Sequence, residues 1–191
     1  MKLRPELLQH PNIPKPLHGL SPRVLKGQKW WDVTRQAAYA STNYHCLACG
    51  VHKTNAKYHS WLEAHEDYDM NFETGEVNIK EIVPLCHACH NFIHSGRLWM
   101  VNIDKNPRKI IDVITHGLDI LHANNLGAQD VSLMVADNVN LKHDCLPMGE
   151  GSVSKEVVAA EWDQWHLVLE GKKYYSKFKD QKEWHHYYAG T

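Results

Sequence analysis

The sequence predicts an α+β fold in which two short strands and a helix surround two C-x-x-C pairs, flanked by longer helices and followed by a C-terminal β-hairpin. Three observations predict it. The pairs Cys46–Cys49 and Cys86–Cys89 bracket segments with strand and helix character. Residues 106–126 carry apolar side chains at the three- and four-residue spacing of an amphipathic helix. Two aromatic-rich runs flank Glu170-Gly171, which is typical of a hairpin turn.

The remaining elements follow from turn and breaker residues. Prolines exclude a long helix from residues 1–20, which we expect to form an extended arm. The polar stretch 67–78, which contains Gly75, is expected to be a loop. We expect helices at 21–41, 87–95 (stopping at Gly96), 106–126 and 180–188, and strands at 59–66, 81–85, 165–169 and 173–178.

Composition excludes several classes of protein. The 191 residues include 21 Lys+Arg and 22 Asp+Glu, so the net charge of -1 lacks the basic excess of a dedicated duplex-DNA binder. No stretch approaches the ~20 apolar residues of a membrane helix, and the N-terminal residues lack the apolar core of an export signal. We therefore expect a cytoplasmic protein without a membrane partner.

The cysteines predict a zinc site. Five cysteines, an odd count, with two C-x-x-C pairs and no export signal, favour metal-bound thiolates over disulfides. Two such pairs complete a closed tetrahedral set, which suits a structural zinc with no open position for a substrate. The predicted ligands are Cys46, Cys49, Cys86 and Cys89, whereas Cys145 stands alone.

A second metal site is predicted from histidines. His90 and His94 are four residues apart on the expected helix, so their side chains share a face and can chelate one divalent cation. A third ligand from an adjacent strand would leave positions open for water and substrate, as metal-assisted hydrolysis requires. His65, near the end of the first expected strand, lies at a suitable place in the sequence.

At these residues the chain resembles the HNH endonucleases, the ββα-metal nucleases, in the variant braced by two C-x-x-C pairs. The resemblance covers about residues 44–98 and rests on Leu62-Glu-x-His65 and on Leu85-Cys-x-x-Cys-His-x-x-Ile-His-x-Gly96. It implies metal-dependent cleavage of DNA, with His65, His90 and His94 as ligands of the catalytic metal. The implied organisation is an arm at 1–20, an HNH-like zinc-binding domain with flanking helices at 21–127, and an aromatic-rich extension at 128–191.

The chain departs from the family pattern at two positions. Glu66 stands where one branch of the family has its general base, and Glu81 stands where the family usually has asparagine. Either Glu66 is the base, or His65 is the base and an acidic side chain completes the metal shell. An additional carboxylate favours Mg²⁺ or Mn²⁺ at the catalytic site, while imidazoles also suit Ni²⁺ or Zn²⁺.

Three functions remain open from the sequence. The first is a DNA endonuclease, with Arg97, Lys53 and Lys57 as candidate phosphate contacts. The second is a catalytically inactive descendant that binds a protein partner, which the near-neutral charge and the two glutamates favour. The third is a zinc protein that binds nucleic acid without cleaving it.

Overall fold

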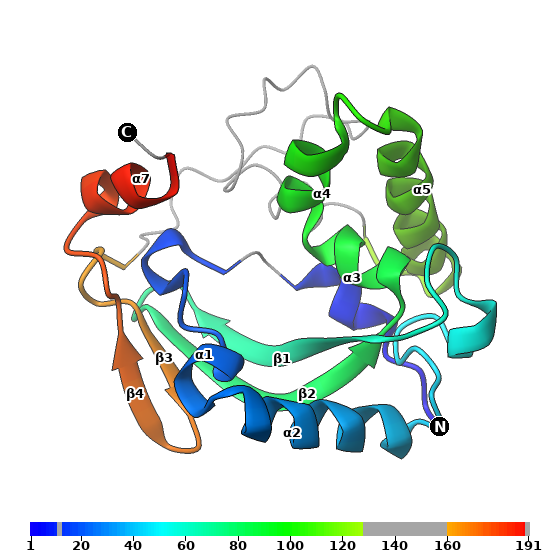
Figure 1. The fold of residues 1–191 in the computed structure, drawn as a ribbon, viewed down its shortest axis with the longest axis horizontal. Coiled ribbons are helices and arrows are strands. Elements are labelled where there is room, and N and C mark those ends of the chain that lie inside the picture. Colours follow the sequence, from blue (N-terminus) through cyan, green and yellow to red (C-terminus); the bar gives the residue numbers. More distant parts are fainter. Residues whose placement is uncertain (11–12, 128–159, 190–191) are drawn as a thin grey trace. The chain divides into compact units, whose positions relative to one another are not determined.

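The computed structural model describes residues 1–10, 13–127 and 160–189, and it is a mixed α+β structure (Figure 1). Cys145 and the first part of the expected C-terminal extension lie outside the described residues. Four strands form one sheet in the order β1-β2-β3-β4. They are β1 (Glu63–Asn71), β2 (Glu76–Leu85), β3 (His166–Leu169) and β4 (Lys172–Tyr175).

Two compact units make up the chain. Within the part of the chain that the structure describes, the first contains residues 1–10, 37–65 and 83–127, and the second contains residues 13–36, 66–82 and 160–189. Strands β1 and β2 contribute residues to both units. Among the described residues, no helix is both long and apolar enough to cross a membrane.

The expected loop at 67–78 is wrong, because β1 and β2 extend through most of it. The connecting turn is tight: the Asn71 side chain accepts hydrogen bonds from the backbone N–H groups of Glu73 and Thr74, both at 3.0 Å. Gly75 closes the turn at a φ of 70°, which favours glycine. The start of β2 is held by β3, since residues 76–78 pair in parallel with residues 166–168. This long-range pairing supports a polar segment that has little strand character by itself.

The helices of the first unit are η1 (Pro5–Gln9), η3 (Lys53–Asn55), α3 (His87–Ile93), α4 (Ser95–Asn102) and α5 (Pro107–Ala123). The expected stop at Gly96 is wrong, because Gly96 lies inside α4. The break occurs instead at His94, whose backbone (φ -90°, ψ 43°) separates α3 from α4.

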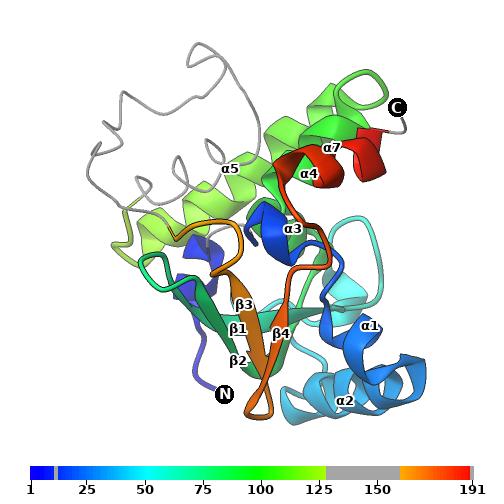
Figure 2. The same cartoon turned by 90° about the vertical axis from the view of Figure 1, so that its left-hand side faces the viewer.

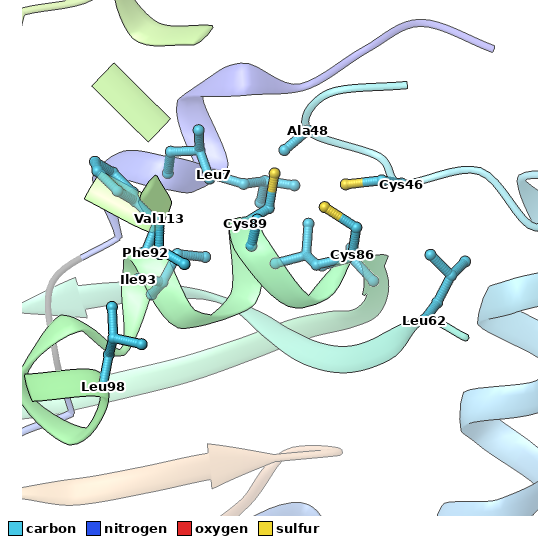
Figure 3. Close-up of a cluster of buried hydrophobic side chains, with 14 of the residues drawn as sticks. Leu7, Cys46, Ala48, Leu62, Cys86, Cys89, Phe92, Ile93, Leu98 and Val113 are labelled. Carbon is cyan, nitrogen blue, oxygen red and sulfur yellow. The ribbon is translucent and has the colours of Figure 1, made fainter. Parts of the chain in front are cut away.

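Helix α5 confirms the amphipathic segment. The Asn106 side chain caps its start by accepting the N–H of Lys109 at 3.2 Å. Gly117 brings α5 against α3, because a Cβ there would lie 2.1 Å from the ring of Phe92. Phe92 is 0% exposed and belongs to an apolar cluster that includes Leu7 and Val113 (Figure 3).

The second unit contains the C-terminal hairpin and has its own apolar cluster. The expected hairpin is confirmed, because β3 and β4 pair antiparallel around Glu170 and Gly171 (Figure 2). The expected final helix is confirmed as α7 (Gln181–Ala189), and a short 3-10 helix, η2 (Lys15–Leu17), also belongs to this unit. Gly27, at a φ of 85°, divides the expected helix at 21–41 into α1 (Pro22–Lys26) and α2 (Gln28–Ser41).

Candidate metal sites

The four predicted cysteines lie together and could hold a metal ion. Cys46 and Cys49 lie on the turn before η3, Cys86 is the residue before α3, and Cys89 lies in its first turn. The thiols of Cys46, Cys86 and Cys89 lie close together beside the apolar cluster (Figure 3). A charged thiolate that is buried from solvent needs a compensating partner, and a bound cation would be one.

The geometry of the thiols fits a zinc ion. A tetrahedral site with Zn–S bonds of about 2.3 Å places its sulfurs about 3.8 Å apart. The sulfurs of Cys49 and Cys86 are 3.8 Å apart. Nε2 of His116 on α5 also lies 3.4 Å from the sulfur of Cys89, where an N–H donor would stabilise a thiolate.

The thiols differ in how readily they ionise. Hydrogen bonds from neighbouring thiols, first that of Cys49, hold the pKa of Cys46 well below its usual value. Interactions with Cys46 and Cys49 raise the pKa of both Cys86 and Cys89. Negative charge therefore accumulates at this cluster only at a growing electrostatic cost, and a cation would remove that cost.

The three predicted histidines also lie together. His65, His90 and His94 each offer a ring nitrogen, and these atoms all lie within 4.8 Å of one another. His65 comes from β1 and is 0% exposed, His90 lies on α3, and His94 is the residue that ends α3. The strand–helix packing thus converts the four-residue spacing of the sequence into a three-imidazole group.

The environment keeps two of these imidazoles neutral. Burial, and then the charges of His90 and Arg97, lower the pKa of His94 to about 3. Burial and the neighbouring histidines lower the pKa of His65 well below its usual value. Neutral imidazole is the form that binds a metal, so His65 and His94 are ready to act as ligands at neutral pH.

The carboxylate of Glu63 contacts one ring nitrogen of His90. Oε2 of Glu63 lies 2.7 Å from Nδ1 of His90, and Oε1 contacts Nδ1 of His87. Burial would raise the pKa of Glu63, but its bonds to His87 and His90 outweigh burial and lower it. An ionised carboxylate on one ring nitrogen orients a metal-binding histidine and increases its basicity.

His10 approaches the same group from the N-terminal segment. Its Nδ1 lies 3.3 Å from Nε2 of His65, and the two ring centroids are 5.5 Å apart. His10 follows directly after η1, whose Leu7 and Leu8 are buried in the first unit's apolar cluster. Packing of these leucines therefore positions His10.

The other predicted site residues lie elsewhere. Glu66 on β1 and Glu81 on β2 belong to the second unit, and Glu81 is exposed. Arg97 is exposed in the first turn of α4, where its charge acts on His94. Nζ of Lys53 lies 3.9 Å from the Tyr44 ring centroid. Nζ of Lys57 lies 2.9 Å from a carboxylate oxygen of Asp112.

Four residues that border the two sites were not predicted from the sequence. They are Glu63, His87, His10 and His116. Two of them carried a local signal. Glu63 is two residues before His65 and so shares its face of β1, and His87 is three residues before His90 on α3. His10 and His116 carried none, since their contacts join residues 55 and 27 positions apart.

Comparisons with family models, curated proteins and solved structures found no match.

Proposed function

We propose that this chain is a metal-dependent endonuclease that hydrolyses phosphodiester bonds in DNA. The observation that carries the proposal is the group of His65, His90 and His94, built from a strand and a helix end beside a four-cysteine cluster. The order β1, β2, α3 and the matching motif residues support an HNH-like ββα-metal unit.

The four-cysteine cluster would hold a structural zinc. Its ligand set is complete with thiolates, so no position is left for a substrate. The ion would connect the turn before η3 to the start of α3 and thereby support the helix that carries His90. It stabilises the site without taking part in the chemistry.

The three imidazoles would hold the catalytic ion, and nitrogen ligands suit Ni²⁺ or Zn²⁺ better than Mg²⁺ or Mn²⁺. Three ligands leave positions for a phosphate oxygen and a water, and the bound cation would supply Lewis-acid stabilisation of the phosphate charge. Glu63 keeps His90 oriented. Because His65 is fully buried against the other two imidazoles, it is better suited as a ligand than as the base. Glu66 directly follows His65, so its side chain lies on the opposite face of β1 and is poorly placed to be the base.

Arg97 is the proposed phosphate contact with the strongest support. It is exposed, lies three residues after His94, and acts electrostatically on that imidazole. Lys57 is less suitable, because an ion pair with Asp112 engages its ammonium group. Lys53 lies over the ring of Tyr44 and is a secondary candidate.

Cleavage of supercoiled plasmid tests the proposal. Wild-type protein and His94→Ala are incubated with Mg²⁺, Mn²⁺, Ni²⁺ or Zn²⁺ in turn, with His122→Ala, an exposed histidine of α5, as the matched control. His94 is preferred to His90 because His90 also contacts Glu63. We expect nicking by the wild type and by His122→Ala. His94→Ala should lose more than the about 10- to 100-fold that loss of a supporting residue costs.

Undiminished cleavage by a folded His94→Ala protein would refute the assignment of the metal site. If the wild type cleaves no plasmid with any of the four ions, the proposed nuclease activity is refuted.

One observation favours a second candidate, a non-catalytic metal protein that binds a protein partner or nucleic acid. The 3.3 Å between His10 and His65 matches the ~3.3 Å separation of two nitrogen ligands on a tetrahedral zinc, so His10 could close the site. A closed site would bind zinc tightly and cleave nothing. Under this candidate, His10→Ala weakens zinc binding in a competition titration, and wild-type protein shows no cleavage.

A further inference from the structure

A third group of possible ligands lies in the first unit, apart from the four cysteines and the three histidines. His59, Glu63 and His87 each offer one donor atom, and these atoms all lie within 4.8 Å of one another. His59 comes from the segment before β1, Glu63 begins β1, and His87 begins α3. We propose that these residues form a third metal site, whose Glu63 carboxylate also contacts His90 of the three-histidine site.

The donor set has the composition of a zinc site with an open position. Two imidazoles and one glutamate are a combination used by zinc enzymes, in which the remaining position takes water. Imidazole nitrogen also suits nickel and copper, so the ligand class is a borderline divalent transition metal. Mg²⁺, which prefers oxygen ligands, is a poor fit.

Contacts around the group hold its members in place. The ring of His59 stacks on the indole of Trp61, with centroids 4.1 Å apart and planes 7° apart. The centroids of His59 and His87 are 4.2 Å apart. His87 is buried, and Nδ2 of Asn91 donates to its backbone carbonyl at 2.9 Å while also lying 3.2 Å from its Nδ1. Pre-positioned ligands lose little conformational entropy when an ion binds.

Glu63 connects the two groups. One of its oxygens contacts His87, and the other lies 2.7 Å from Nδ1 of His90 in the three-histidine group. Ion pairing alone would account for both contacts, and stacking on Trp61 for the ring of His59. Neither accounts for the His59 ring nitrogen, which lies within 4.8 Å of the donor atoms of Glu63 and His87. An ion bound by His59, Glu63 and His87 would fix the carboxylate, and through it the orientation of His90. Occupancy of this site is then expected to strengthen ion binding by the three histidines. This coupling rests on the proposed function, whereas the site itself does not.

Metal content of the full-length protein, saturated with Zn²⁺ and freed of excess by gel filtration, tests the site. With three groups occupied, the wild type should hold three ions per chain, and His122→Ala should match it. His59→Ala should hold one fewer. This variant removes a half-buried side chain from a segment outside the helices and strands, and circular dichroism checks that it folds.

Parallel variants separate this inference from the proposed function. His94→Ala should also lose one ion, and the double variant should lose two. Loss of an ion in His59→Ala but not in His94→Ala would support the new site and contradict the catalytic one. Unchanged zinc content in a folded His59→Ala protein would overturn the inference and reduce the trio to a hydrogen-bond network.

Glu63→Gln gives a second readout. It preserves the size of the side chain but removes its charge, so it should abolish the site of His59, Glu63 and His87 and weaken ion binding by the three histidines about 10- to 100-fold. Wild-type Zn²⁺ affinity at both sites, measured by competition with a chromophoric chelator, would contradict the role of Glu63.

Discussion

Replacing Cys89 by serine removes one ligand from the proposed structural zinc at the point where α3 begins. Cys46 and Cys89 are 0% exposed and Cys86 is 2% exposed, within the same apolar cluster as Phe92 and Ile93. A serine hydroxyl is not ionised at neutral pH and is a poor zinc ligand. The substitution therefore leaves polar groups buried around a damaged site.

The expected loss of stability is large. Zinc binding by a small structural site contributes about 10–16 kcal/mol, whereas a whole domain is stable by only about 5–15 kcal/mol. An unpaired buried hydroxyl adds a penalty of about 1–3 kcal/mol. Even partial loss of the ion should therefore unfold the first compact unit, including α3 and the three-histidine group.

Two measurements check this result, with Cys145→Ser as the matched control. Zinc content should fall in Cys89→Ser by at least the one ion of the four-cysteine cluster, and remain unchanged in Cys145→Ser. The urea midpoint, followed by circular dichroism, should fall in the first variant only. A Cys89→Ser protein that kept its zinc and its midpoint would refute the four-thiolate site.

Three further predictions concern stability. Gly117→Ala should destabilise the protein by about 1–3 kcal/mol in urea unfolding, because the new methyl group would overlap the Phe92 ring. An unchanged urea midpoint would contradict the close packing of α5 on Phe92. Asn106→Ala should cost about 0.5–2 kcal/mol by removing the cap of α5, whereas Asn106→Asp should restore most of it. Burial lowers the pKa of His18, with a smaller contribution from Lys15. The unfolded chain therefore binds the proton more readily than the folded protein does. The free energy of unfolding should fall as pH drops below 6.5. Urea midpoints recorded against pH should show this slope in the wild type and a weaker one in His18→Gln; equal slopes would contradict the role of His18.

Local patterns predicted the elements whose stability is local. The amphipathic spacing and cap of α5, and the aromatic runs around Glu170-Gly171, are properties of neighbouring residues, and both elements are confirmed. The start of β2 was missed because residues 76–78 pair with residues 166–168, which are about ninety positions away in the sequence. The continuation of helix through Gly96 was missed because glycine has a low helix propensity, whereas the burial of this segment keeps it helical.

The metal sites show the same difference between features set by neighbouring residues and features set by long-range contacts. By itself the sequence determined the four cysteines and the spacing of His90 and His94, because chelation by a short turn or one helical turn is a local property. Only the tertiary structure decided that Glu63 would lie between His87 and His90, and that His10 would reach His65. Those contacts follow from packing of η1 against α3 and from the placement of β1 beside that helix. Burial of apolar side chains drives this packing without leaving a short-range pattern in the sequence.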